Sequence, residues 1–467
     1  MDYTREDGCC HKIPETIRPQ PGDTATVSDI ITHINQFFTE FGAQIWLAVS
    51  GRSLGQWVYL LFPFFVFAEM PRYVIPAVVV PLLGLFRRGR EKETMKRQAF
   101  LATEPLISII VPARNEEKVI RECLRSLLET GYKNKQIVMV DDSSTDNTYA
   151  IAKKFADRGE ITLLRNTSPE GRGGKAFAMN LALNVCKGDY IVQVDADTTF
   201  DRTTLEEMLA PFADPQVGAV TGNIKVRNAS VNIVTKFQAC EYLLSITLWR
   251  NWASRLGILL QIAGGLSCFR KELLKDVGAW DSELVEDADL TMKIRKLGHK
   301  TVFARSAVAF TTVPETLNAL AAQRRRWERG FFRTFFRKHI DVMLPWRFHF
   351  SNFIELLLQF FFTILCPYLY YSYLVALMIW RAELVPIFLV ASYIIYEIFF
   401  FFLLLSAISL SERRKEEWHY LVYVLILPLV NEYLRFVRAV SYILELLRIR
   451  YEDPHLPAKT WKHAPRW

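Results

Sequence analysis

Apolar residues concentrate in long runs toward the C-terminal end of this chain, and no other feature limits its fold as strongly. Residues 360–366 and 399–405 are almost wholly apolar, whereas residues 87–97 are mostly charged. A helix crosses a bilayer with ~20 apolar residues, and residues 350–380 and 384–410 are each long enough to do so. The sequence therefore predicts a membrane protein with at least two C-terminal spans.

The segment after these spans, residues 418–447, is harder to place. It is largely apolar, but it also contains, among other polar residues, Pro428, Asn431, Glu432, Arg435 and Arg438. A cytosolic tail at residues 448–467 requires either that this segment enters the bilayer and returns, or that one span fewer exists elsewhere. The sequence leaves both arrangements open and assigns residues 348–447 as a whole to the transmembrane region.

The N-terminal part contains a second membrane-associated region, residues 27–90. Residues 1–26 are polar and mixed in charge, which predicts a mobile tail without a cleavable signal peptide. Residues 27–47 repeat apolar positions with a 3.6-residue period, typical of an amphipathic helix on the bilayer surface or against the next segment. Residues 57–86 are long for one span and short for two, and we favour a tight hairpin. The basic residues from Arg87 to Lys92 then place the following region in the cytoplasm.

The charge balance also fits a membrane protein. The chain has 57 Lys and Arg against 49 Asp and Glu, a net charge of +8. On a membrane protein such an excess marks cytoplasmic loops that face anionic lipid, and no nucleic-acid motif accompanies it. The seven cysteines form no CxxC pair, which indicates reduced thiols on the cytosolic side. These features predict a multi-pass protein of the plasma (inner) membrane that has membrane lipid, and no nucleic acid, as a partner.

Between the two membrane regions, residues 105–310 have the pattern of an α/β domain. Short apolar runs alternate with helical patterns: the runs are 106–111, 136–140, 162–164, 190–194 and 217–221, and the helical patterns are 117–129, 148–157, 175–185 and 203–212. Such alternation is typical of a parallel, doubly wound sheet. We therefore expect a Rossmann-like cytosolic domain over residues 100–314, followed by interfacial amphipathic helices over residues 315–347.

Acidic residues cluster where the predicted strands end, which is where ligands bind in an open parallel sheet. There are three such clusters: Asp141 with Asp142, Asp195 with Asp197, and Glu286 with Asp287. A carboxylate pair spaced by one residue, such as Asp195 and Asp197, can hold a hard divalent cation that also binds diphosphate oxygens. A solvated turn is the alternative for one such pair. The apolar strand before it, and the acidic strand end upstream, favour a metal and nucleotide site.

Two loops suit the rest of a nucleotide diphosphate. Residues 112–116 leave the first strand and can wrap a base and ribose. Residues 171–175, Gly-Arg-Gly-Gly-Lys, form a basic loop that opens a helix, so Lys175, backbone N–H groups and the helix N-terminus suit a phosphate. This loop is not a P-loop, because Ala176 stands where Ser or Thr is needed, and an ATPase is therefore disfavoured.

Six segments then identify a family. VPARNEE, VDDSSTD, GGKAFAMN, VDADT, VEDADLTMKI and QRRRW occur in this order between about residues 104 and 340. Together they resemble the family-2 inverting glycosyltransferases and, within them, the membrane-embedded processive synthases of cellulose, chitin, hyaluronan and poly-N-acetylglucosamine. The resemblance implies a metal-dependent hexosyltransferase with Mg²⁺ or Mn²⁺ and a UDP-sugar donor. The expected fold is an α/β GT-A domain in the cytoplasm, with flanking transmembrane and interfacial helices.

The resemblance also implies roles at the donor end. Asp141 and Asp142 would contact the uridine, Asp195 would help to hold the nucleotide, and Asp197 would ligate the metal. Further donor-binding residues are expected at Pro112, Ala113, Arg114, Glu116, Lys175, Ala196 and Arg326. Asp287 would be the general base that takes a proton from the acceptor hydroxyl, although the motif here begins with Val285 in place of Thr.

QRRRW fits the family pattern QxxRW, in which Trp327 would offer a flat apolar face to the terminal sugar of the acceptor. Gln323, Gly264 and Glu286 are the other expected acceptor-binding residues. A basic interfacial helix with a Trp at headgroup level is the alternative interpretation. The carboxylates upstream favour the acceptor site.

Three classes of function remain in view. The first is a synthase that uses UDP-GlcNAc or UDP-Glc to elongate a β-linked polysaccharide and then translocates this product. Such a synthase is compatible with accessory export subunits. The second is a non-processive β-glycosyltransferase that makes a glycolipid of the glucosyl-diacylglycerol or ceramide type. The third is a transporter or scaffold with an inert nucleotide domain. EDADLTMK is nearer to the poly-N-acetylglucosamine synthase form than to the hyaluronan synthase form, and no clear counterpart of the cellulose synthase FxVTxK loop follows QRRRW.

Overall fold

The computed structural model describes residues 90–449 except 168–172, 345 and 347, together with isolated positions between 32 and 79. Several sequence expectations therefore lie wholly or almost wholly outside the described residues: the mobile tail at 1–26, the amphipathic helix at 27–47, the membrane segment at 57–86 and the C-terminal tail at 448–467.

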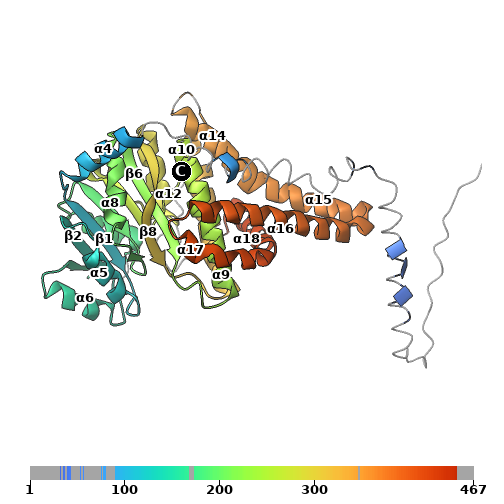
Figure 1. Cartoon of the computed structure of the whole chain (residues 1–467), viewed down its shortest axis with the longest axis horizontal. Coiled ribbons are helices and arrows are strands. Elements are labelled where there is room, and N and C mark those ends of the chain that lie inside the picture. The colour runs from blue at the N-terminus through green and yellow to red at the C-terminus, as the bar shows by residue number, and fades with distance from the viewer. Residues whose placement is uncertain are drawn as a thin grey trace, which may run out of the picture.

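An eight-stranded mixed sheet forms the centre of the α/β domain, in the order β3-β2-β1-β4-β7-β6-β8-β5 (Figure 1). The first four strands in this order are mutually parallel: β3 (Thr162–Arg165), β2 (Lys135–Asp141), β1 (Ile107–Ala113) and β4 (Tyr190–Val194). β7 (Leu266–Arg270) runs antiparallel to both of its neighbours, β4 and β6 (Val217–Val226). β6 pairs in parallel with β8 (Lys300–Thr311), and β5 (Thr199–Phe200) pairs antiparallel with β8.

The five expected strands all run in the same direction, but the expectation of a parallel sheet is wrong for the sheet as a whole, in which β7 and β5 run antiparallel to their neighbours. Three strands, β5, β7 and β8, were not expected. β5 has only two residues, and the sequences of β7 and β8, LSCFR and KTVFARSAVAFT, mix polar residues into the apolar pattern. β7 inserts between β4 and β6 and reverses the strand direction there. The five expected strands and four expected helices all exist, with ends that differ by a few residues.

The alternation of side chains along the strands fills two layers, one on each face of the sheet. Ile107, Ile109 and Val111 of β1 pack in the layer under α5 (Ile120–Glu129), α6 (Thr148–Ala156) and α8 (Thr204–Leu209). Ile110 faces the opposite layer, which is covered by α7 (Lys175–Leu183), α11 (Lys271–Asp276) and α12 (Glu286–Lys296). A strand buried on both faces has no solvent-facing polar side, which is why residues 106–111 are apolar except for the buried Ser108.

Short helical segments complete this domain and link it to the rest of the chain. They are α4 (Arg90–Leu101), η2 (Ala210–Ala213), α9 (Ile233–Tyr242), η3 (Leu243–Arg250) and α10 (Asn251–Arg255). α9 begins with a capping box, in which the Asn232 side chain accepts from the backbone N–H of Thr235 and the Thr235 hydroxyl receives the Asn232 N–H. Cys240, Leu244 and Leu248 then pack against α16, so α9 and η3 join the sheet to the C-terminal helices.

The C-terminal helices begin at the edge of the α/β domain. α13 (Leu317–Arg333), η4 (Thr334–Lys338) and η5 (Ile340–Met343) form the basic region that was expected at the interface. They are followed by α14 (Phe350–Gln359), η6 (Phe360–Leu365), α15 (Cys366–Trp380), η7 (Ala382–Leu384), α16 (Val385–Leu410), α17 (Arg414–Glu417), η8 (Trp418–Ile426) and α18 (Leu427–Leu446). In Figure 1, α15 and α16 extend away from the sheet.

Three helical segments in the described part of the chain are long and apolar enough to cross a membrane: Phe350–Trp380, Ala382–Leu410 and Arg414–Leu446. The first two confirm the expected candidates at residues 350–380 and 384–410. The third covers the segment that the sequence left unplaced. Proline stands in the first turn of α15, α16 and α18, where its missing N–H costs no helical hydrogen bond.

Candidate active site

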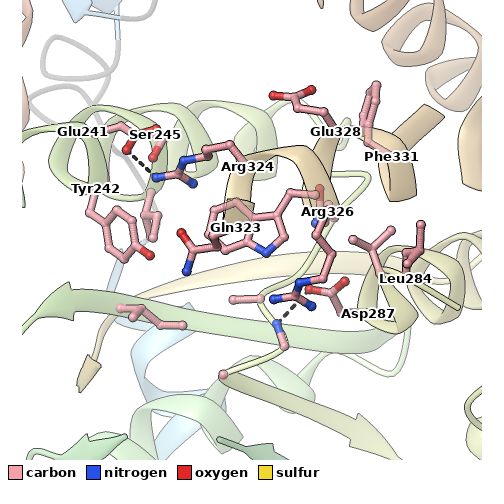
Figure 2. A pocket seen from close by; sticks show the side chains of 18 of the residues that line it. Glu241, Tyr242, Ser245, Leu284, Asp287, Gln323, Arg324, Arg326, Glu328 and Phe331 are labelled. Atoms are coloured by element: carbon pink, nitrogen blue, oxygen red, sulfur yellow. Dashed lines mark hydrogen bonds and ion pairs between the residues drawn. The ribbon is translucent and has the colours of Figure 1, made fainter. Parts of the chain in front are cut away.

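One large cavity, of about 890 Å³, connects the carboxyl ends of the strands with the candidate membrane spans. At the sheet it is lined by the loops that follow β1 and β4 and by the N-termini of α7 and α12. η3 and α13 form its middle part, shown in Figure 2. Its far end is lined by side chains of the candidate spans, among them Gln359, Thr363, Tyr370, Tyr396, Glu432 and Arg435.

Fifteen of the sixteen residues that the sequence singled out line this one cavity: Pro112, Ala113, Arg114, Glu116, Asp142, Lys175, Asp195, Ala196, Asp197, Gly264, Glu286, Asp287, Gln323, Arg326 and Trp327. The exception is Asp141, which is fully buried at the end of β2 and forms an ion pair of 3.2 Å with Arg165. The structure therefore brings together residues more than two hundred positions apart, and it places Asp141 behind the cavity wall.

Asp142 organises the start of α7. Its Oδ1 accepts hydrogen bonds from Asn166 Nδ2 at 2.7 Å and from the Gly173 N–H at 2.9 Å, and its Oδ2 accepts from the Gly174 N–H at 2.8 Å. Gly174 has a φ of +85°, which a residue with a side chain rarely adopts. The carboxylate therefore fixes the described end of the glycine-rich loop directly before Lys175.

Lys175 links two of the acidic clusters. Its Nζ lies 2.6 Å from Asp195 Oδ1 and 2.9 Å from Glu286 Oε1. Burial opposes the charged form of this amine, but the two carboxylates outweigh it and raise the pKa of Lys175. The ammonium is therefore a permanent positive charge on the cavity wall, at the point where α7 faces α12.

Negative charge accumulates around Asp197. Burial, and then the neighbouring charge of Asp195, raise the pKa of Asp197, although its carboxylate accepts hydrogen bonds from Thr198 and Thr311 at 3.1 Å. Burial, followed by repulsion from Asp197 and Asp195, raises the pKa of Glu116 to about 7. Three carboxylates that repel one another are an arrangement that a divalent cation would stabilise.

A metal at this position would need ligands from a bound substrate as well. In the described part of the chain, no three Asp, Glu, His or Cys side chains converge closely enough to hold an ion by themselves. Mg²⁺ in nucleotide enzymes is commonly held by one or two carboxylates together with substrate phosphates and water. The pair Asp195 and Asp197 fits that pattern.

Asp287 lies in the first turn of α12. Its Oδ2 accepts from the Gly264 N–H at 2.9 Å, and its Oδ1 accepts from the Ala288 N–H at 2.8 Å. Burial, followed by repulsion from Glu286, raises the pKa of Asp287 to about 6, and the positive charges of Lys175 and Arg250 limit the rise. A carboxylate with this pKa is ionised at neutral pH and is a competent proton acceptor.

The acceptor residues expected from QRRRW come from α13. Trp327 lines the cavity and packs against the apolar cluster that contains Leu260 and Val285. In Figure 2 the side chain of Arg326 reaches into the part of the cavity where Asp287 lies. The buried Oε1 of Gln323 accepts no hydrogen bond from the described residues, which leaves it available to a bound hydroxyl.

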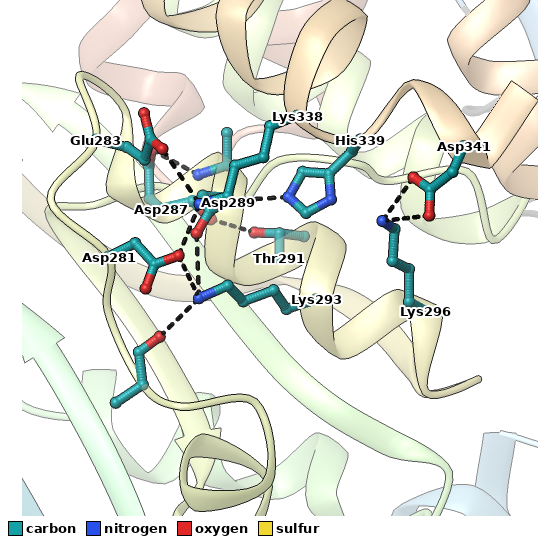
Figure 3. Close-up of polar contacts among 12 residues, drawn as sticks. Asp281, Glu283, Asp287, Asp289, Thr291, Lys293, Lys296, Lys338, His339 and Asp341 are labelled. Atoms are coloured by element: carbon teal, nitrogen blue, oxygen red, sulfur yellow. Dashed lines mark hydrogen bonds and ion pairs between the residues drawn. The ribbon is translucent and has the colours of Figure 1, made fainter. Parts of the chain in front are cut away.

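A buried charge network holds α12 against the segment that follows Trp327 (Figure 3). Asp289 is fully buried, and its Oδ1 lies 2.7 Å from Lys338 Nζ and 2.9 Å from His339 Nε2. Lys338 and Lys293 also both reach Asp281, at 2.7 and 2.9 Å. Burial opposes ionisation, but the His339 hydrogen bond and the lysine charges lower the pKa of Asp289.

Several residues of the cavity were missed at the sequence level. Thr311 ends a strand that was not expected, and Arg250, Glu241 and Tyr242 belong to helices that carry no motif. Gln193 does not line the cavity but supports its wall, and it could have been found because it interrupts the apolar run YIVQV. Its side chain donates to the Gly264 carbonyl at 2.9 Å and accepts from the Trp280 indole N–H at 3.0 Å.

Comparisons with known proteins agree with this geometry. Residues 105–330 match the family model described as "Glycosyltransferase like family 2". The poly-beta-1,6-N-acetyl-D-glucosamine synthase of Staphylococcus aureus (strain COL) is 32% identical over 244 residues, which is 52% of this chain and 58% of that protein. The synthase of the same name from Staphylococcus epidermidis is 33% identical over 226 residues, 48% of this chain and 54% of that protein. The chain thus matches little more than half the length of these relatives.

A solved structure shows the same fold. The mannosyltransferase from Pyrobaculum calidifontis, in complex with GDP-Man and Mn²⁺, superposes with a TM-score of 0.51 over 70% of this chain and 87% of that one, at 22% identity. The family match covers the segment that holds Asp142, Asp195, Asp197, Asp287 and QRRRW. Residues 105–330, which match the family-2 glycosyltransferase model, thus carry the similarity between this chain and that family.

Proposed function

We propose that this chain is a membrane-embedded, inverting hexosyltransferase that uses UDP-GlcNAc or UDP-Glc to elongate a β-linked polysaccharide and passes the product between its own membrane helices. The observation that carries the proposal is the single cavity that runs from the strand-end carboxylates, past Asp287 and Trp327, to side chains of all three candidate spans. The names of the staphylococcal relatives favour N-acetylglucosamine as the sugar.

The donor would lie at the sheet end of the cavity. Residues 112–116 and Asp142 would contact the nucleoside, and Lys175, Arg326 and the N-terminus of α7 would neutralise the diphosphate. Asp141 would act through Asp142, since it lies behind the wall. Asp195 and Asp197 would hold Mg²⁺ or Mn²⁺ together with the diphosphate, and the ion would offset the charge that develops on the leaving UDP.

Asp287 would carry out the proton transfer. The acceptor hydroxyl gives its proton to Asp287 while its oxygen forms a bond to the anomeric carbon of the donor sugar. The bond between that carbon and the diphosphate oxygen breaks at the same time, so an α-linked donor gives a β-glycoside. The hydrogen bond from Gly264 to Asp287 Oδ2 and the one from Ala288 to Oδ1 keep the carboxylate in position for this attack.

The acceptor would enter from the membrane end. Trp327 would stack on its terminal sugar, and Gln323, Gly264 and Glu286 would surround the reacting hydroxyl. Beyond Trp327 the wall carries aromatic and polar side chains, including Tyr370, Tyr396 and Asn431, which suit a hydrated glycan better than a lipid tail. The catalytic domain would face the cytoplasm of a plasma (inner) membrane protein, and accessory export subunits would act on the far side.

The test is UDP release by the purified protein in lipid nanodiscs, across a panel of UDP-sugars with Mg²⁺ or Mn²⁺, followed by sizing and enzymatic digestion of the product. We expect a polymer from UDP-GlcNAc or UDP-Glc. Asp287→Asn should lower UDP release by ~10²–10⁴-fold, whereas Asp276→Asn, at an exposed carboxylate outside the cavity, should not. A product limited to one sugar on a lipid would support the glycolipid alternative instead.

A further inference from the structure

Two arginines of QRRRW, Arg324 and Arg325, stand at the positions that the QxxRW pattern leaves undefined, and the structure separates them sharply. Arg325 is exposed, whereas Arg324 is only 7% exposed and lines the cavity. Since they are neighbours on the same helix, this difference comes from the face of α13 to which each belongs. A guanidinium buried next to a ligand cavity has to be held by specific partners.

Arg324 has two such partners. Its Nη2 donates to Glu241 Oε2 at 2.6 Å, a charge-assisted hydrogen bond that comes from α9, a different part of the domain. Its Cζ lies 4.3 Å from the centre of the Trp327 ring, in a cation–π contact. Residues three apart on a helix lie on the same face, so Arg324 is placed to cover the indole from its own helix. Figure 2 shows Arg324 directed toward Glu241 and Ser245 of α9 and η3.

We propose that Arg324, held by Glu241, is a positioning residue that fixes the indole of Trp327 and so determines how firmly the acceptor glycan is retained. This proposal rests on the proposed function. A pyranose stacks on an aromatic ring through its C–H groups and needs one accessible face of that ring. Arg324 occupies the other face, and the apolar cluster around Leu260 and Val285 packs against the side chain. The indole is therefore held in one orientation before the acceptor binds, so no conformational entropy of the Trp327 side chain is lost at each sugar addition.

The contacts of Arg324 differ from those of the residues expected to bind the UDP-sugar donor. Its carboxylate partner Glu241 belongs to α9, whereas the ammonium of Lys175 pairs with Asp195 and Glu286 at the donor end. A loss of Arg324 should accordingly leave binding of the UDP-sugar intact and weaken retention of the acceptor. In a processive enzyme the second effect appears as shorter products, because the chain dissociates more often between additions.

The experiment compares Arg324→Met, Glu241→Gln and the matched control Arg325→Met in nanodiscs with UDP-GlcNAc. It measures the donor KM, the product length and the fraction of sugar released as free GlcNAc. We expect Arg324→Met and Glu241→Gln to shorten the product about tenfold, because the loss of a desolvated cation–π contact changes an equilibrium by roughly this factor. The hydrolysed fraction should rise, and the donor KM should stay within about twofold of the wild-type value. Arg325→Met should match the wild type, and Arg324→Lys should restore part of the length.

Each other outcome contradicts the proposal in a defined way. Unchanged product length in both Arg324→Met and Glu241→Gln would show that the indole needs no such support. A donor KM that rises in parallel with the loss of length would place Arg324 at the donor. If the wild type adds only one sugar to a lipid, the proposed function fails separately, and the same variants are then compared by the KM for that lipid. The isosteric Glu241→Gln variant provides the answer should Arg324→Met fail to fold.

Discussion

At the scale of single residues, the chemistry of the site depends on how α12 presents Asp287. The side chain is held by two backbone N–H groups, and burial together with Glu286 raises its pKa to about 6. A general base works in its ionised form, so its pKa sets the lower pH limit of the reaction. The neighbouring Glu116 has a pKa of about 7 from burial and from repulsion by Asp197, and the two groups have to be told apart by experiment.

The first prediction concerns this pH limit. In the wild type, kcat/KM should fall about tenfold per pH unit below a pH of about 6, because protonated Asp287 cannot accept a proton. Glu286→Gln removes a negative neighbour and should move this limb to lower pH, whereas Glu116→Gln should leave its position unchanged. The measurement is the pH profile of UDP release at saturating metal. A limb that follows Glu116 instead would assign the limit to the donor end.

The second prediction concerns Gly264. A Cβ at this position would lie 3.2 Å from Lys175 Nζ and 3.3 Å from Asp287 Oδ2, closer than most side chains tolerate. Gly264→Ala should therefore displace the base or the lysine and lower kcat by about a hundredfold, since small misplacements of reacting groups have effects of this size. The melting temperature should change little. Full activity in this variant would show that the backbone does not approach the acceptor so closely.

At the scale of elements, the strength of the sequence patterns decided what could be predicted. β1, β2 and β4 are mostly apolar, and acidic residues stand at or shortly after their carboxyl ends, so both the strands and the convergence of their carboxyl ends could be expected. β7 and β8 contain polar side chains with partners distant in sequence, such as Arg270 of β7, whose Nε donates to the Val217 carbonyl at 2.8 Å. The local sequence therefore could not predict the reversal of strand direction at β7 or the position of Thr311 beside Asp197.

The third prediction is made at this scale and concerns the anchoring of α12. Asp289 is fully buried between Lys338, His339 and Lys293, and removal of one member of a buried ion pair typically costs about 3–5 kcal/mol. Asp289→Asn should lower the melting temperature by on the order of 10 °C. Because the folded-state pKa of Asp289 is lowered, its contribution is present above the unfolded-state value and is lost as the pH falls through the folded-state value.

A matched control is available in the same region (Figure 3). Asp341 pairs with Lys296 at 2.7 Å, but both side chains are partly exposed, at 30% and 19%. Such a pair contributes on the order of 0–1 kcal/mol. Asp341→Asn should therefore leave the melting temperature nearly unchanged. If Asp341→Asn and Asp289→Asn lower the melting temperature equally, the burial of Asp289 does not add to the stability that its ion pairs provide.

At the scale of the whole molecule, the α/β domain and the membrane helices are connected through α13 and α18. Glu445 of α18 is almost fully buried and lies 2.9 Å from Arg329, 3.2 Å from Arg333 and 2.7 Å from Arg337. Glu328 of α13 in turn accepts from Arg438 at 2.8 Å and from the Tyr442 hydroxyl. The third candidate span is therefore bound by ion pairs and hydrogen bonds to the helix that carries Trp327. The sequence does not predict this contact, because the paired residues lie more than a hundred positions apart.

The last prediction follows from this connection. Glu445→Gln removes the carboxylate that the buried Arg329 shares with the partly exposed Arg333 and Arg337, so the contact of α18 with α13 and η4 should weaken by about 3–5 kcal/mol. We expect faster backbone hydrogen exchange in residues 317–338 and shorter polymer products, because Trp327 loses its fixed position at the membrane end. Glu416→Gln, which removes an exposed carboxylate paired with Arg413, is the control and should change neither quantity. Unaltered exchange across α13 in Glu445→Gln would mean that apolar packing, and not the ion pairs of Glu445, joins the two parts.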